Sequence, residues 1–175
     1  SAAFDASVTD SVASFDASTS ADTDGTIECW GGESFGEATA PTGTFLSVTA
    51  GEYHSCGLRT DHTVTCWGWN GEGQKLVPPG TYDSVSTAVN ATCGLHTDGT
   101  AECWGAFDAP ILVERTGVFT AIAVGADHAC GLRPNNTVQC WGSNAWGYAS
   151  PPGGTFIALQ ASCGIRPDHT LTCWG

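Results

Sequence analysis

The chain has 175 residues, of which 41% are hydrophobic and only 13% charged, so it is not a disordered segment and is long enough for one sizeable domain. Its formal net charge of -13 makes nucleic acid and anionic membrane surfaces poor partners. No apolar run approaches the roughly 18 residues of a membrane span, so we expect no membrane insertion. No signal peptide is visible and the first residue is Ser1, which we interpret as a processed or partial chain.

The first segment, residues 1–24, is rich in Ser, Ala, Thr and Asp and contains Phe-Asp-Ala-Ser twice, starting at Phe4 and Phe15. We leave three interpretations open: a degenerate half-repeat, a flexible tail, or a strand donated to a neighbouring molecule. A donated strand would bury Phe4, Val8, Val12 or Phe15 against another subunit.

Residues 25–175 repeat with a period of about 37 residues, which indicates an array of small structural units. Abundant Gly, Thr, Val and Trp favour strands and turns within each unit. A second cysteine precedes each of the last four Cys-Trp-Gly triplets by ten residues, whereas Thr19 stands at that position in the first copy. Cys29 therefore has no partner at this spacing. The triplets begin at Cys29, Cys66, Cys103, Cys140 and Cys173.

The residues between each cysteine pair predict a β-hairpin with a three-residue loop. The third loop position is His62, Gly99, Asn136 or His169, residue types that tolerate a positive φ. A type I turn closed by a left-handed residue places the two cysteines directly opposite each other, within reach of a disulfide. We therefore predict the bridges Cys56–Cys66, Cys93–Cys103, Cys130–Cys140 and Cys163–Cys173.

Strand alternation places Cys56, Leu58 and Val64 on one face of the hairpin and Trp67 on the other. Both faces carry large or apolar side chains, so we expect both to be covered, as in a stack of blades. The tryptophan of each Cys-Trp-Gly triplet recurs in every copy. We favour packing between blades for it over a ligand-binding ring.

Nine cysteines at regular spacing favour an oxidising compartment and hence a secreted, extracellular protein. Two glycosylation sequons, at Asn90 and Asn135, weakly support the same interpretation. We expect both asparagines to be exposed, and to carry glycans if the source glycosylates Asn.

The segment Trp67-Gly-Trp-Asn-Gly-Glu-Gly-Gln74 resembles the signature of the regulator-of-chromosome-condensation repeats, and residues 141–147 are a second match. Residues 50–56 and 124–128 resemble the family's Ala-Gly-x-x-His segment. The resemblance covers about residues 25–175. It implies an all-β, β-propeller-like array of about five short blades, forming a ring or an open arc.

Two departures limit what the resemblance implies. Propellers of this family commonly have seven blades, which about four and a half copies cannot make. The cysteine pairs inside the repeats mark a secreted branch, unlike the nuclear exchange factor of the family, so exchange-factor activity is not implied.

Three short patterns suggest chemistry, and each has a simpler interpretation. Gly32-Glu-Ser-Phe-Gly36 matches a nucleophile elbow, but no helix follows and Gly36 is the repeat equivalent of Gly73. His54-x-Cys56 and its counterpart His128-x-Cys130 resemble zinc ligands, but their cysteines are used in the predicted bridges.

The third pattern, Asp22-Thr-Asp-Gly-Thr26, resembles a calcium loop but coincides with the hairpin turn of the first copy. We therefore predict no catalytic residue, no metal site and no cofactor, and we do not expect an enzyme.

Four aromatic residues that do not recur in every copy are candidates for an exposed contact surface, since aromatic side chains dominate interface energetics. We consider two functions. The first is an extracellular structural protein that associates head to tail with copies of itself into a fibre or coat. The alternative is a secreted propeller, such as an adhesin or enzyme inhibitor, that binds another extracellular protein through its loops. The four aromatic residues are Tyr53, Trp69, Trp146 and Tyr148.

Overall fold

The computed structural model describes residues 12–15, 25–30, 34–106 and 117–175, and in this part every regular element is a β-strand. Accordingly, none of these residues belongs to a helix that could cross a membrane. The strands are β1 (Val12–Phe15), β2 (Ile27–Trp30), β3 (Phe45–Ala50), β4 (His54–Arg59), β5 (Val64–Gly68), β6 (Tyr82–Thr87), β7 (Ala91–His96), β8 (Ala101–Gly105), β9 (Ala121–Val124), β10 (His128–Leu132), β11 (Val138–Gly142), β12 (Ala158–Gln160), β13 (Cys163–Ile165) and β14 (Leu171–Cys173).

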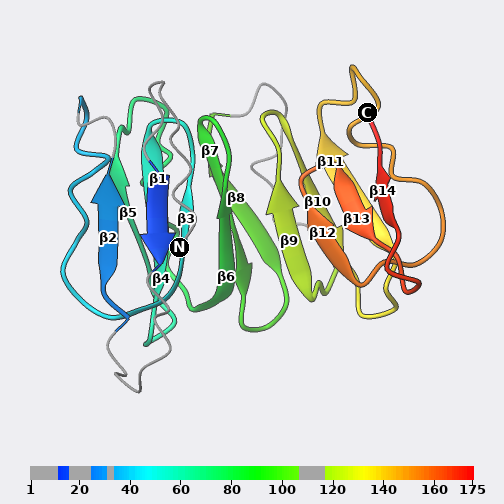
Figure 1. Cartoon of the computed structure of the whole chain (residues 1–175), viewed down its shortest axis with the longest axis horizontal. Coiled ribbons are helices and arrows are strands. Elements are labelled where there is room, and N and C mark those ends of the chain that lie inside the picture. The colour runs from blue at the N-terminus through cyan, green and yellow to red at the C-terminus, as the bar shows by residue number, and fades with distance from the viewer. Residues whose placement is uncertain (1–11, 16–24, 31–33, 107–116) are drawn as a thin grey trace.

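The strands form five antiparallel sheets that follow one another in chain order. We number them blades one to five: β1–β2, β3–β5, β6–β8, β9–β11 and β12–β14. Figure 1 shows the blades side by side in a row, with blade one at one end and blade five at the other. The predicted all-β, propeller-like array is confirmed, and of the two shapes considered, the described blades form an open row.

The hairpin prediction is confirmed in blades two to five. His62, Asn136 and His169 have φ values of 66°, 65° and 66°, and Gly99 has 84°. In blade two the amide of His62 donates to the carbonyl of Arg59 over 2.9 Å, which closes the turn.

This turn sets the pairing register, so that Cys56 lies opposite Cys66 with the two Cα atoms 4.0 Å apart. All four predicted bridges form at S–S distances between 1.96 and 2.07 Å. Cys29 takes part in none of them.

Blade one differs from the sequence-based expectation. β1 pairs with β2 in the same chain and places Ala13, not Thr19, opposite Cys29. Val12 and Phe15, which a donated strand would have placed against another subunit, are thus part of the chain's own first blade, as in the half-repeat interpretation. Pairing within one chain avoids the entropy loss of bringing two molecules together. Phe4, Val8 and Thr19 lie outside the described residues.

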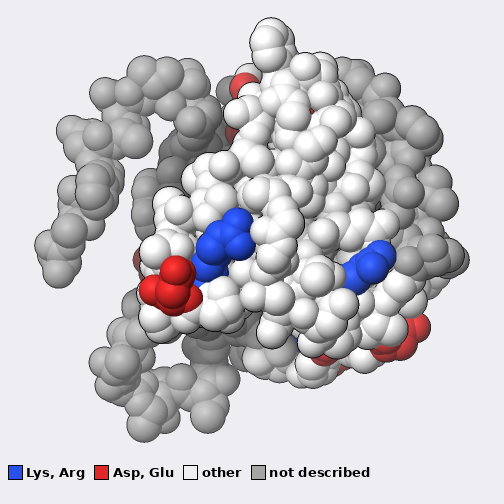
Figure 2. Space-filling model, turned by 90° about the vertical axis from the view of Figure 1, so that its right-hand side faces the viewer, with Lys and Arg blue, Asp and Glu red and all other residues white. Residues whose placement is uncertain are grey.

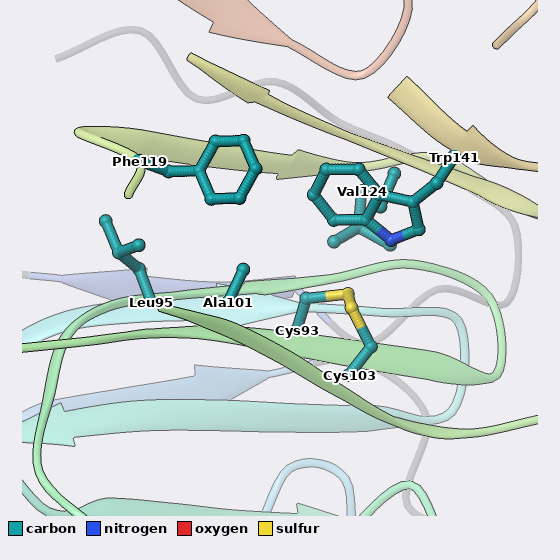
Figure 3. Packing of buried hydrophobic residues seen from close by; sticks show 8 residues of the cluster. Cys93, Leu95, Ala101, Cys103, Phe119, Val124 and Trp141 are labelled. Atoms are coloured by element: carbon teal, nitrogen blue, oxygen red, sulfur yellow. A yellow bond between two sulfur atoms is a disulfide. The ribbon is translucent and has the colours of Figure 1, made fainter. Parts of the chain in front are cut away.

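The core lies in the junctions between blades. Figure 3 shows the Cys93–Cys103 bridge, Leu95 and Ala101 of blade three facing Phe119, Val124 and Trp141 of blade four. In the preceding junction, Leu58 of blade two packs with Tyr82 and Trp104 of blade three. The cysteine-bearing face of one blade therefore meets the aromatic face of the next, so both faces are covered, as expected.

A glycine in the middle strand of blades two to five lets an aromatic ring approach the sheet closely. A Cβ atom on Gly94 would lie only 2.4 Å from the ring of Tyr82. His96 stacks on this ring at 4.3 Å between centroids. Equivalent approaches occur at Gly57, Gly131 and Gly164, against Phe45, Phe119 and Phe156.

Candidate contact surfaces

Two kinds of hydrogen bond recur between a blade and the preceding part of the chain. The indole Nε1–H of Trp104 donates to the carbonyl of Gln74 over 2.8 Å, and Trp67 donates to Glu37 in the same way. The amide of Tyr82 donates to the carbonyl of the turn residue His62, also over 2.8 Å. Trp67, Trp104 and Trp174 therefore serve blade packing, which is the role that the sequence favoured for this position.

His54 also links blades. Its ring is fully buried, and its Nε2 lies 2.9 Å from Oγ1 of Thr92 in the next blade. Burial penalises the charged ring and lowers the pKa of His54 to about 4. His128 lies similarly near Ser162, at 3.3 Å. Both histidines thus occupy inter-blade contacts, and within the described ranges no three or more His, Cys, Asp and Glu side chains gather in a way that could hold a metal ion.

The cysteine-bearing face of blade five is uncovered in this structure. Ile165 is 38% exposed, whereas its repeat equivalents Leu58, Leu95 and Leu132 are at most 5% exposed. Leu171 is 68% exposed, although the equivalent Ala101 of blade three is buried. Figure 2, which views the blade-five end of the molecule, shows a surface with few charged side chains. We call the side chains of Ile165 and Leu171 the open face.

Blade one shows the complementary feature at the other end of the row. Trp30 is 52% exposed, whereas its equivalents Trp67, Trp104 and Trp141 are each at most 7% exposed because the preceding blade covers them. In the described chain, the cysteine-bearing face of blade five and the Trp30 side chain of blade one are therefore both uncovered. In the interior of the row, a tryptophan of this kind covers such a face.

An aromatic cluster lies at the junction of blades one and two. Phe35 comes from the loop between β2 and β3, Tyr53 from the turn before β4, and Trp69 follows β5. The ring centroids are 6.0 Å apart for Phe35 and Tyr53, 6.3 Å for Phe35 and Trp69, and 6.2 Å for Tyr53 and Trp69. Phe35 is 52% exposed and the other two rings are half-buried. We call these three residues the aromatic cluster.

Two of the four predicted contact aromatics, Tyr53 and Trp69, are thus brought together, and the other two lie in the loop that follows β11. Trp146 is 73% exposed. Tyr148 stacks on His128 at 5.2 Å, and its carbonyl accepts the indole N–H of Trp174, so it serves packing.

Sequence reasoning missed Phe35 because it weighed this segment as a nucleophile elbow or a repeat loop and did not consider its aromatic residue as part of a contact surface. Gly36 has a φ of 86°, close to the 82° of Gly73, and the carboxylate of Glu37 accepts the amide of Phe35 as Gln74 accepts that of Glu72. The segment is therefore a repeat loop, as its spacing indicated. The signal that could have found Phe35 is its equivalence to the exposed Trp146, since both occupy the same loop position.

The two sequons differ in exposure. Asn135 is exposed in its hairpin turn, where its Oδ1 accepts the amide and hydroxyl of Thr137. Asn90 is half-buried and its Oδ1 is inaccessible to solvent, which corrects the expectation that it is exposed. The cause is the amide of Ala106, which donates to the Asn90 carbonyl and draws the turn against the end of β8.

Comparisons with known proteins agree with this geometry. Residues 45–74 and 119–147 match the family model of the regulator of chromosome condensation (RCC1) repeat. A comparison with curated protein sequences found no significant match.

Among solved structures, the entire ectodomain of the Physcomitrella patens receptor kinase CR4 matches with a TM-score of 0.74 and 29% identity, over 86% of this chain and 47% of that one. The CRINKLY WD40 ectodomain of the Arabidopsis thaliana receptor kinase ACR4 matches with a TM-score of 0.71 and 30% identity, over 85% of this chain and 59% of that one. Prp20p from Saccharomyces cerevisiae shares the fold, with a TM-score of 0.59 and 16% identity over 73% of this chain and 42% of that one.

The chain spans about half the length of the two receptor ectodomains. Its sequence motifs, its three-stranded sheets and its structural neighbours all indicate the same architecture. Residues 45–74 and 119–147 thus match the regulator-of-chromosome-condensation repeat, and the disulfide-containing blades of the chain form a β-propeller-like array.

Proposed function

We propose that this chain is an extracellular, non-catalytic structural protein whose blades associate end to end with a second copy of the chain. The four disulfides support an oxidising compartment. The two receptor ectodomains to which it is similar support an extracellular location.

The open face of blade five is the observation that carries this proposal. In blades two and three the equivalent of this face is buried by an aromatic ring and a tryptophan of the following blade, as Leu58 is by Tyr82 and Trp104. Burying a Leu or Ile side chain contributes about 1.5–3 kcal/mol, so the exposed Ile165 and Leu171 favour a contact that covers them.

A second copy offers a suitable occupant because its blade one carries the exposed Trp30. The two surfaces are different, so the contact is heterologous and each association leaves a new open face and a new Trp30. Such a contact extends into a chain of molecules unless its rotation closes a ring.

Sedimentation velocity over a concentration series tests this proposal, comparing the unchanged chain with Leu171→Glu and Leu76→Glu. Leu76, which lies in the loop after β5, is 67% exposed and is therefore a matched control for Leu171 at 68%. We expect the mean mass of the unchanged chain and of Leu76→Glu to rise with concentration, and Leu171→Glu to remain a monomer with its four disulfides intact. A monomeric unchanged chain, or equal association of all three proteins, would overturn the proposal.

A further inference from the structure

We infer that the aromatic cluster of Phe35, Tyr53 and Trp69 is a docking site for a basic segment of a partner protein, which inserts an arginine or lysine side chain against the rings. This inference develops the second function considered above, a protein-binding propeller. It does not depend on end-to-end association.

The fold does not require these three rings. The residues at the repeat position of Phe35 are Glu72 and Trp146, and those at the position of Tyr53 are Asn90 and Asp127. Ala106 and Ser143 stand at the position of Trp69. Blades three and four form the same hairpins and junctions without an aromatic trio. The cluster is therefore an addition to the repeat, made by three separate loops at one junction.

The rings are also placed where a partner can reach them. Phe35 is 52% exposed, and the steep angles between the planes, 81° for Phe35 and Tyr53 and 78° for Tyr53 and Trp69, leave rings facing in several directions. A parallel platform of ring faces, which suits stacking on a flat sugar, is absent from this trio. A cation binds against the negatively polarised face of a single ring and needs no parallel platform of rings.

The distribution of charge favours a cationic partner. The whole chain carries a formal charge of -13. Glu52 is adjacent to Tyr53, and Glu72 follows Trp69 by three residues, while the one nearby cation in the described loop is Lys75. The described arginines lie beside the hairpin turns, at the opposite ends of the strands from the aromatic cluster. Arg59 is the last residue of β4, Arg133 follows β10 and Arg166 follows β13.

These arginines are also engaged. The Arg59 guanidinium lies 4.7 Å from the centroid of the Phe45 ring and donates to Thr65, and Arg166 does the same with Phe156 and Thr172. These arginines therefore do not neutralise the carboxylates in the loops that carry the aromatic cluster. A basic segment therefore meets aromatic rings and the carboxylates of Glu52 and Glu72 there, and the negative field of the chain speeds its approach.

The test measures binding of a six-residue peptide of alternating Gly and Arg, with blocked termini, to the Leu171→Glu protein, so that end-to-end association does not interfere. Intrinsic tryptophan fluorescence and isothermal titration calorimetry report the affinity. We expect binding that weakens as salt is raised, and a loss of roughly five- to tenfold in affinity for Phe35→Ala and for Trp69→Phe, as the size of cation–π contacts implies.

Trp146→Ala is the matched control, because Trp146 is exposed and occupies the repeat position of Phe35 in blade four. It should bind the peptide as tightly as the parent protein. Phe35→Ala changes an exposed side chain, so its thermal unfolding midpoint should match that of the parent. Absence of peptide binding, equal losses in all three variants, or binding of a neutral six-residue glucan in place of the peptide would overturn the inference.

Discussion

The imidazole Nε2 of His54 lies 2.9 Å from Oγ1 of Thr92, across the junction between blades two and three. Both residues are fully buried, so the contact lies in a junction shielded from solvent. The histidine resists protonation because its charge would be desolvated, and its pKa is lowered to about 4. The stability of this junction should therefore depend on pH.

Acidification should destabilise the fold through His54. The folded-state pKa of about 4 lies below the ordinary value of 6.5, so the unfolded chain binds more protons between these values. The contribution of the neutral His54 ring to the free energy of unfolding is complete above about pH 6.5. It is lost progressively as the pH falls toward 4, by an amount of the order of 3 kcal/mol. Urea unfolding at a series of pH values measures this dependence.

The variant His54→Gln removes the titrating ring while keeping a polar group that can reach Thr92. Its free energy of unfolding should fall less steeply than that of the unchanged protein over this pH range. The pKa values of the exposed Asp61, Asp98 and Asp168 are lowered, chiefly because the Thr two residues later donates a hydrogen bond to each carboxylate. Protonation of these carboxylates therefore affects stability at more acidic pH than protonation of an ordinary aspartate would. Identical pH profiles for the two proteins would contradict the assignment.

Trp104→Phe should lower the free energy of unfolding by about 1–3 kcal/mol, because the Gln74 carbonyl loses a buried hydrogen-bond donor while most of the apolar contact is kept. Chemical denaturation measures the change. Trp146→Phe is the control, and since that side chain is 73% exposed, its unfolding curve should match that of the parent. An equal loss of unfolding free energy in Trp104→Phe and Trp146→Phe would show that the effect does not come from the junction between blades.

Gly94→Ala should lower the free energy of unfolding by about 1–3 kcal/mol, because the added Cβ would lie 2.4 Å from the Tyr82 ring and force this packed ring to shift. Gly153→Ala adds the same methyl group where no atom lies within 4 Å. Its unfolding midpoint should stay unchanged. A harmless Gly94→Ala would mean that the ring does not pack on the sheet as described.

The four disulfides should differ in their resistance to reduction. Cys93 is fully buried and Cys103 nearly so, whereas Cys173 is exposed and Cys163 half-buried at the open face. A thiolate reductant needs access to sulfur, so the Cys163–Cys173 bridge should open first. Alkylation after mild reduction, followed by peptide mapping, identifies the first pair. Earlier modification of Cys93 and Cys103 would contradict this order.

Local chemistry made much of this fold predictable from sequence. A ten-residue spacing with His62 or Gly99 at the turn specifies hairpin register, and register alone brings the cysteines together. Blade one was harder, because the strand opposite Cys29 carries no cysteine to mark it. The half-burial of Asn90 was missed because its turn is held by the amide of Ala106, sixteen positions along the chain.

The aromatic cluster illustrates a second limit. Tyr53 and Trp69 could be singled out because they depart from the repeat. Their meeting with Phe35, however, depends on how three loops converge at one junction, which repeat spacing does not encode.

Mixing two blocked variants tests end-to-end association most directly. Leu171→Glu alters the open face of blade five, and Trp30→Glu alters the complementary end at blade one. Each variant alone should remain monomeric, whereas an equimolar mixture should form a one-to-one heterodimer and nothing larger, because one intact open face meets one intact Trp30. A mixture that stays monomeric in sedimentation velocity, under conditions in which the unchanged chain associates, would contradict the head-to-tail contact.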